Sequence, residues 1–190
     1  FVLGTRPELI KMAPLILEAK KNPSIKSVVC STGQHKEMLE SLFDLFDIRP
    51  DVDFKLMKPN QSLINFHSET MLCMDKVIDD YKPDWVIVQG DTTSAHAAAM
   101  TAFYKKVPVA HVEAGLRSFD RTMPEEINRL LTDAIADLLL VTEQSGVTNL
   151  RNEGVHERKI RLVGNVMIDT LRRWLPAARS RATAERLGLA

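Results

Sequence analysis

Cationic and carboxylate side chains stand where several apolar runs of the sequence end. Arg6 and Lys11 follow the first run, and Asp91 and Glu113 lie at the ends of two later ones. An arginine and a lysine at a helix start suit a phosphate group, because free backbone N–H groups and the helix dipole also favour an anion there. Carboxylates can act as general acids and bases. These residue types predict a site that binds an anionic group and moves protons beside it.

Each of these residues also has a structural explanation. Arg6 and Lys11 could be solvated cations at a helix start, and Asp91 could cap the helix that follows it. Glu113 ends a core strand, where a carboxylate would be poorly solvated, and burying it without a purpose would be costly. A function is therefore favoured for Glu113. We expect His111, two residues earlier on the same strand, to be a structural histidine with satisfied hydrogen bonds.

A further polar cluster at residues 122–129 contributes Glu125 and Arg129. Thr122 and Glu125 have the spacing of a helix capping box, and Glu125 and Arg129 have the i, i+4 spacing of an ion pair on one helix. These explanations suffice for the cluster taken alone. Combined with an anion-binding helix start, however, three carboxylates at one edge of a sheet form a set of groups suited to acid–base chemistry.

The elements that must position these residues are short apolar runs alternating with segments of helical period. The runs lack period-two alternation, as is typical of parallel strands covered on both faces. Strand and helix alternate repeatedly, which predicts an α/β fold with a doubly wound, Rossmann-like parallel sheet that binds ligands at the carboxyl ends of its strands. The expected strands are residues 1–3, 27–31, 85–89, 107–112, 138–141 and 160–163; the expected helices are residues 7–21, 36–47, 62–81, 93–105, 124–136 and 144–152.

The sequence changes character after residue 165. We expect residues 1–165 to form the Rossmann-like domain, and residues 166–190 to form an interdomain helix and linker leading to a second domain that this chain lacks. The helix should run from Val166 to Trp174 and stop at Pro176. Because the first apolar run is shorter than a usual buried strand, we also expect that residue 1 is not the native start.

Composition argues against several classes of partner. The 25 basic residues balance the 25 acidic ones, which leaves no excess charge for nucleic acid or an anionic membrane. No apolar run approaches the ~20 residues that span a bilayer. Cys30 and Cys73 have no metal or redox spacing, and two structural thiols fit a reducing, cytoplasmic location.

Sequence motifs for cofactors and metals are also absent. The eight glycines never have the Gly-x-Gly-x-x-Gly spacing and no Walker A pattern occurs, so we expect no nicotinamide and no other cofactor. His111 and Glu113 match half of a zinc deaminase signature, but its Cys-x-x-Cys half is missing, so we expect no metal.

Six short blocks occur in order across residues 4–169. They are Gly-Thr-Arg-Pro-Glu-Leu-Ile-Lys-Met-Ala-Pro (4–14), Thr-Gly-Gln-His (32–35), Gly-Asp-Thr-Thr (90–93), His-Val-Glu-Ala-Gly-Leu-Arg (111–117), Pro-Glu-Glu-Ile-Asn-Arg (124–129) and Gly-Asn-Val-Met-Ile-Asp (164–169). Together they resemble the non-hydrolysing UDP-N-acetylglucosamine 2-epimerases, and six blocks in register make a chance resemblance improbable.

The resemblance implies a GT-B-like enzyme with two Rossmann-type domains and a UDP-sugar bound between them. It also implies interconversion of UDP-N-acetylglucosamine and UDP-N-acetylmannosamine, a homodimer, and an inactive fragment when the second domain is missing. Family positions for substrate binding correspond to Arg6, Lys11, Asp91 and Glu113, and those for catalysis to Asp91, Glu113, Glu125 and Arg129.

A second nucleotide-sugar site lined by Gln34 and His35 is a further implication of the resemblance. Glu69 stands where members regulated by their own substrate carry an arginine, which weakens this implication. The segment 117–123 is also shorter than in the best-known members, which leaves the sugar substituents open.

The chemistry that fits these residues is elimination of UDP across C1–C2 of the sugar, followed by re-addition with a proton delivered to the other face. Two alternatives remain open at this point. A GT-B glycosyltransferase would share the fold and the sugar nucleotide but transfer the sugar to an acceptor. A non-catalytic module would bind the sugar nucleotide without turnover.

Overall fold

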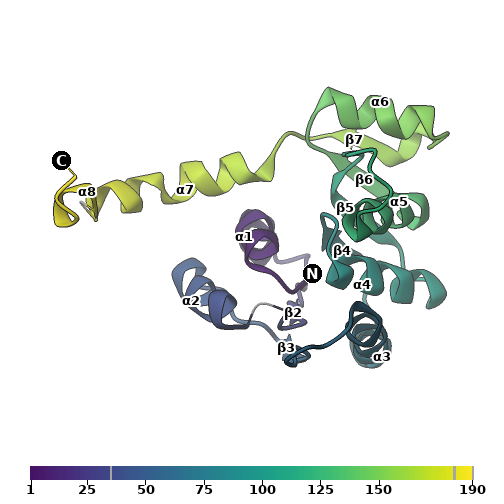
Figure 1. The fold of residues 1–190 in the computed structure, drawn as a ribbon, viewed down its shortest axis with the longest axis horizontal. Coiled ribbons are helices and arrows are strands. Elements are labelled where there is room, and N and C mark those ends of the chain that lie inside the picture. The colour runs from purple at the N-terminus through teal and green to yellow at the C-terminus, as the bar shows by residue number, and fades with distance from the viewer. Residues whose placement is uncertain (35, 182, 190) are drawn as a thin grey trace.

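The computed structural model describes residues 1–34, 36–181 and 183–189 (Figure 1). Strands and helices alternate along the chain, as the apolar runs predict. The strands are β1 (Val2–Leu3), β2 (Cys30–Ser31), β3 (Val52–Asp53), β4 (Val86–Gln89), β5 (Val109–Ala114), β6 (Leu138–Val141) and β7 (Ile160–Leu162). The helices are α1 (Arg6–Lys21), α2 (Lys36–Phe46), α3 (Leu63–Tyr81), α4 (Thr93–Tyr104), α5 (Pro124–Ile135), α6 (Gln144–Asn152), α7 (Val166–Ser180) and α8 (Thr183–Arg186), with a 3-10 turn at Glu157–Lys159.

The strands pair in parallel throughout. Hydrogen bonds join them in the orders β1-β2-β3 and β4-β5-β6-β7, and β1 contacts β4 where the two sets meet. From that point the chain winds outwards in two directions, which confirms the doubly wound α/β fold. In such folds ligands bind at this switch point, beyond the carboxyl ends of the central strands. The turns after β1 and β4 are therefore the first place to look for a site.

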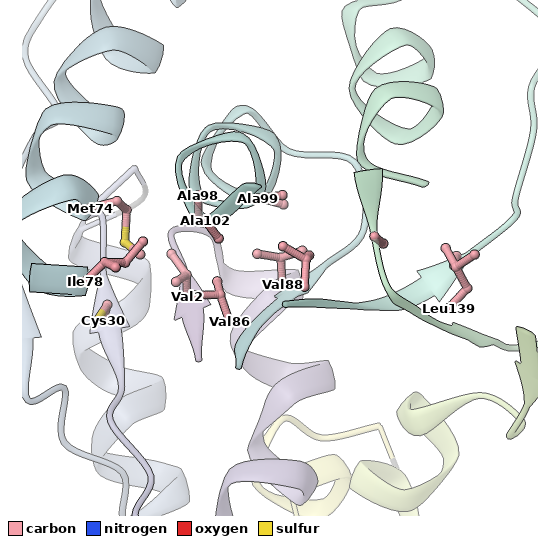
Figure 2. Close-up of a cluster of buried hydrophobic side chains, with 14 of the residues drawn as sticks. Val2, Cys30, Met74, Ile78, Val86, Val88, Ala98, Ala99, Ala102 and Leu139 are labelled. Atoms are coloured by element: carbon pink, nitrogen blue, oxygen red, sulfur yellow. The ribbon is translucent and has the colours of Figure 1, made fainter. Parts of the chain in front are cut away.

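Two hydrophobic cores cover the two faces of the strands. Successive strand residues point to opposite faces, so Leu3 packs with α1 and α2 whereas Val2 packs with α3 and α4. On the second face, Figure 2 shows the small alanine side chains of α4 lying over the valines of β1 and β4. Burial on both faces explains why these strands read as continuous apolar runs.

Helix α7 extends well beyond the body of the molecule (Figure 1). Its first part packs on α1 and α2: the Thr170 hydroxyl donates to the Ile10 carbonyl at 2.6 Å, and the Trp174 ring lies 4.5 Å from that of Phe46. The prediction that this helix stops at Pro176 is wrong, because α7 continues to Ser180. Both Pro176 and Arg172 are exposed, so water can bond the carbonyl that the proline leaves without a donor.

Most predicted boundaries agree with the structure to within two residues. Strand β5 extends to Ala114 instead of ending at Val112, and β2 is confined to two of its five predicted residues. Strand β3 was not predicted, because Val52 is only half-buried and Asp53 is exposed. Among the described residues, no helix is long and apolar enough to cross a membrane.

Candidate functional site

The turn after β1 is organised by Glu8. Its carboxylate Oε2 accepts hydrogen bonds from the backbone N–H groups of Gly4 (2.8 Å) and Thr5 (2.6 Å), while Oε1 accepts one from the Thr92 hydroxyl at 2.5 Å. Thr92 belongs to the turn after β4, so this bond joins the two central turns. Burial raises the pKa of Glu8, although the hydrogen bonds to Thr92, Gly4 and Thr5 oppose that rise.

Gly4, in the loop after β1, lies against the loop after β2 and the start of α4. A β-carbon at this position would overlap the hydroxyl oxygens of Thr32 and Ser94. Those hydroxyls are 2.8 Å apart, and Ser94 also donates to the side-chain carbonyl of Gln34 at 2.9 Å. Gln34 is therefore held beside the β1 turn, whereas His35 lies outside the described residues.

Arg6 and Lys11 differ sharply in environment although both stand on α1. Arg6 is exposed, and no hydrogen bond or ion pair links it to the part of the chain that the structure describes. Lys11 is only 18% exposed, and its Nζ lies 2.8 Å and 2.6 Å from the two carboxylate oxygens of Glu113. The Gln89 side chain donates a third bond to Glu113, at 3.1 Å.

A bulge in β5 directs Glu113 toward α1. The pairing with β6 shifts between Val112 and Ala114, and Glu113 has a φ of 70°. Val112 packs in the core on the α1 side and Ala114 in the core on the opposite side. Simple alternation would have given Glu113 the side of His111. The bulge places it on the side of Lys11 instead.

Asp91 follows β4 and forms an ion pair with Arg129 of α5. The Asn128 side chain donates to the backbone carbonyl of Asp91 at 3.0 Å. The helix after this turn is capped by Thr92, whose hydroxyl accepts from the Ala95 N–H at 3.0 Å. The alternative explanation of Asp91 as the helix cap is therefore wrong, and its carboxylate faces α5.

The cluster at residues 122–129 differs from its sequence-based interpretation. Pro124 starts α5 and Met123 caps it, so Thr122 and Glu125 do not form a capping box. Arg129 pairs with Glu126 at 2.6 Å, in addition to Asp91, and not with Glu125. Glu125 is exposed at the start of the helix, because the helix turns Glu126 inward.

Glu126 is almost fully buried and accepts hydrogen bonds from the loop that precedes α5. It accepts from the backbone N–H of Ser118 (3.0 Å), the Ser118 hydroxyl (3.0 Å) and the Phe119 N–H (3.0 Å). Burial alone would raise the pKa of Glu126, but these hydrogen bonds and the Arg129 guanidinium hold it below its usual range.

His111 is buried with both ring nitrogens bonded, which confirms the expectation of a satisfied strand histidine. Its Nδ1 lies 2.6 Å from Oδ1 of Asp133, and its Nε2 lies 2.8 Å from the carbonyl oxygen of Gly90. The other oxygen of Asp133 accepts from the Gly115 N–H (3.0 Å) and the Arg117 guanidinium (2.7 Å). Arg117 in turn forms a bidentate pair with Glu153, at 2.7 Å and 2.6 Å.

Four of these residues were missed from the sequence: Glu8, Gln89, Glu126 and Asp133. Two patterns could have revealed three of them. Thr5 and Glu8 have the spacing of a capping box, and Glu126, Arg129 and Asp133 occur at i, i+3 and i+7, which is one face of a helix. In the described ranges, no group of three or more histidine, cysteine or acidic side chains could hold a metal ion.

Comparison with known proteins gives the family. A sequence model described as UDP-N-acetylglucosamine 2-epimerase matches residues 17–188. The chain belongs to the UDP-N-acetylglucosamine 2-epimerase family. A UDP-N-acetylglucosamine 2-epimerase of Bacillus subtilis is 46% identical over 172 residues, which cover 90% of this chain and 45% of the relative. A putative enzyme of that name from Clostridium acetobutylicum is 45% identical over 172 residues, with 90% and 45% coverage.

Solved structures of the epimerase family have the same fold. The enzyme from Neisseria meningitidis, bound to UDP-GlcNAc, superposes with a TM-score of 0.93 at 42% identity and covers 97% of this chain and 50% of that one. The Methanocaldococcus jannaschii enzyme, in complex with UDP-GlcNAc and UDP, gives 0.92 at 37% identity, with 98% and 51% coverage. The chain thus spans about half the length of the relatives that it matches.

Proposed function

We propose that this chain is the N-terminal domain of an enzyme that interconverts UDP-N-acetylglucosamine and UDP-N-acetylmannosamine by inversion at C2. The observation that carries the proposal is the arrangement at the switch point of the sheet. Arg6, which pairs with no described residue, stands at the start of α1, and two carboxylate–cation pairs, Lys11–Glu113 and Asp91–Arg129, stand at the turns of the same sheet edge. Membership of the epimerase family and the UDP-GlcNAc bound to the Neisseria relative support the same reading.

Arg6 and Lys11 are the proposed ligands of the diphosphate. Arg6 lies in the first turn of α1, where backbone N–H groups and the helix dipole add to its charge. Because no described residue competes for its guanidinium, Arg6 can take a phosphate oxygen directly. Lys11 would have to share its charge between the diphosphate and Glu113.

Asp91, Glu113 and Glu125 are the proposed acid and base groups. The pairing partner of Asp91 comes from α5 and that of Glu113 from α1, so the two carboxylates are held from opposite sides of the sheet edge. Inversion at C2 requires proton transfer on both faces of the sugar ring, and two carboxylates held in this way suit that need. Arg129 would hold the Asp91 carboxylate in place.

The proposed reaction has two balanced steps. A carboxylate removes the C2 proton while the bond from C1 to the UDP oxygen breaks, which yields UDP and a 2-acetamidoglucal. The diphosphate oxygen then adds back to C1, and a carboxylic acid delivers a proton to the opposite face of C2. Cations on the diphosphate stabilise the charge that develops on the leaving group.

The rest of the proposed enzyme follows the family. We propose that residues 1–165 form the N-terminal domain, that residues 166–190 lead to a second domain of a GT-B-like pair, and that the cytoplasmic protein is a homodimer. Gln34 and His35 would line a second nucleotide-sugar site. In this proposal the chain alone epimerises nothing, because a cleft with one wall does not exclude water; robust epimerisation by the purified chain would contradict it.

Turnover of the full-length protein in D2O tests the proposed reaction. Elimination and re-addition place solvent deuterium at C2 of the product, without added nicotinamide. A product with undeuterated C2 would contradict the mechanism. Transfer of the sugar to an acceptor without exchange at C2 would identify a glycosyltransferase, and tight binding without turnover would identify a non-catalytic module.

Charge-deleting variants of the full-length protein test the residue roles. Asp91→Asn and Glu113→Gln keep side-chain size, so they should lower kcat by about a hundredfold or more, as expected for acid–base groups, with little change in melting temperature. Arg6→Ala should mainly weaken UDP binding. A near-normal kcat in either carboxylate variant, or unchanged UDP affinity for Arg6→Ala, would remove that residue from the proposed site.

A further inference from the structure

The backbone around Asp91 is held on both sides. The carbonyl of Gly90, in the peptide bond before Asp91, faces Nε2 of His111, and the carbonyl of Asp91 itself accepts from Asn128. Gly90 has a φ of 71°. With both flanking peptide planes fixed, residues that do not touch the Asp91 carboxylate help to set the direction of its side chain, in addition to its ion pair with Arg129.

The hydrogen-bond partners of His111 indicate which of its ring nitrogens carry a proton. A carbonyl oxygen only accepts, so Nε2 must carry a proton for Gly90. An ionised carboxylate also only accepts, so Nδ1 must carry a second proton for Asp133. Burial opposes ionisation of Asp133, yet its pKa lies below its usual range. Apart from His111, the Arg117 guanidinium at 2.7 Å and the Gly115 N–H at 3.0 Å favour the ionised form.

The charges of the whole cluster then balance. His111 and Arg117 each contribute one positive charge, and Asp133 and Glu153 each contribute one negative charge. The side chains of His111, Asp133 and Arg117 are 0%, 1% and 1% exposed, whereas that of Glu153 is 35% exposed. The result is an alternating row of charges that runs from the Asp91 turn to the surface.

We infer that His111 is a positioning residue: a buried, doubly protonated imidazole, held by Asp133 and Arg117, that fixes the Gly90 carbonyl and thereby aims Asp91. This inference rests on the proposed function, in which Asp91 acts on the sugar. A charge-assisted hydrogen bond is shorter and stronger than a neutral one. A buried ion pair adds little net stability over apolar residues, so the row of charges contributes direction more than stability.

Asp133→Asn is the variant that tests the inference. Its amide can donate to Nδ1 and its oxygen can accept from Gly115 N–H, so the packing survives while His111 loses one proton. The matched control is Asp137→Asn. The Asp137 side chain is half exposed and accepts from the Val109 N–H at the start of β5, whereas Asp133 accepts from the Gly115 N–H just after the end of that strand.

Nitrogen NMR of the histidine ring gives the first readout, which does not depend on turnover. At neutral pH, wild-type His111 should show two similar ring-nitrogen shifts, as an imidazolium does, if both nitrogens donate as the hydrogen bonds indicate. Asp133→Asn should show two widely separated shifts, and its Asp91 amide signal should move. A neutral His111 in the wild type would overturn the inference even if the enzyme epimerises.

Steady-state kinetics of the full-length protein give the second readout. Asp133→Asn should lower kcat at least about tenfold with KM within about threefold, because a misdirected group affects the transition state more than binding. Asp137→Asn should match the wild type. His111→Gln, whose amide can still donate to Gly90, should retain more kcat than His111→Leu.

The two ways of failing are distinguishable. Wild-type protein that does not epimerise would contradict the proposed function, and the ring-nitrogen and Asp91 signals would still decide the inference. Wild-type turnover together with a normal kcat per folded molecule in Asp133→Asn would overturn the inference alone.

Discussion

Glu8 and Asp133 are both buried at the carboxyl edge of the sheet, at 1% and 2% exposure, yet their pKa values shift in opposite directions. Among the described residues, the donors to Glu8 are neutral, and they include the backbone N–H groups of Gly4 and Thr5 and the Thr92 hydroxyl. Asp133 accepts from a guanidinium, an imidazole and one N–H group. Burial raises the pKa of Glu8, whereas cationic partners lower that of Asp133 in spite of burial.

The difference shows that burial alone does not decide the direction in which the pKa of a carboxyl group shifts at this edge of the sheet. The β1 turn is tied together by a carboxyl group whose hydrogen-bond donors are neutral. The turns after β4 and β5 are tied together by charged partners. In the proposed enzyme the first region would receive the anionic diphosphate, and the second would move protons.

The largest expected effect comes from removing Asp133. Asp133→Ala leaves His111 and Arg117 buried without their shared partner, so it should lower the free energy of unfolding by about 3–5 kcal/mol, as breaking a buried ion pair does. Glu8→Ala removes hydrogen bonds from neutral donors and should lower the free energy of unfolding by about 1–3 kcal/mol. Urea unfolding at neutral pH measures both. Equal losses of unfolding free energy in the two variants would contradict the claim that charged partners distinguish Asp133 from Glu8.

A third buried group, His96, extends the comparison, because one of its ring nitrogens has no hydrogen-bond partner among the described residues. His96 of α4 is 7% exposed, its Nδ1 has no hydrogen-bond partner among the described residues, and the His67 ring lies 5.1 Å away. Burial, and secondarily the charge of His67, lower the pKa of His96 to about 4. Since the folded pKa is below the unfolded one, this group's contribution to stability is present above pH 6.5 and lost as pH falls toward 4.

Acid unfolding measures the size of this contribution. A shift from 6.5 to about 4 corresponds to a loss on the order of 3 kcal/mol across that range. His96→Phe stays neutral at every pH, so its stability relative to the wild type should rise as pH falls from 6.5 to 4. If the two proteins lose stability in parallel, His96 is charged in the fold and the assignment of an unpartnered neutral ring is wrong.

A smaller effect is expected where the β1 turn meets its neighbours. Gly4→Ala would push a methyl group onto the hydroxyls of Thr32 and Ser94, and such overpacking costs about 1–3 kcal/mol. The displaced turn should also weaken the bond from Gly4 N–H to Glu8. Thermal unfolding measures the loss. A variant as stable as the wild type would show that the β1 turn can move without loss of stability.

How far the sequence predicts this structure depends on which forces act locally. Apolar runs mark β4 and β6 well, because burial on both faces leaves a continuous pattern. Strand β3 leaves no such pattern. The bulge at Glu113 cannot be read in advance, because it requires a positive φ in a residue that seldom adopts one.

In the candidate site, too, some features follow from the local sequence and others only from tertiary packing. Arg6, Lys11, Asp91 and Glu113 follow apolar runs, so the sequence predicts their common edge. Their partners are decided by tertiary packing. Asp133 and Glu126 lie on a helix, where acidic residues usually face water, and only their shared spacing with Arg129 indicates a buried polar face.

Carboxyl-carbon NMR titration of Glu8 and Asp133 in the same sample tests the central comparison most directly. The signal of Glu8 should move with a midpoint above the ordinary value of 4.5, and that of Asp133 with a midpoint below the ordinary value of 3.8. Midpoints displaced in the same direction would contradict the account, because burial would then outweigh the charge of the partners at both turns.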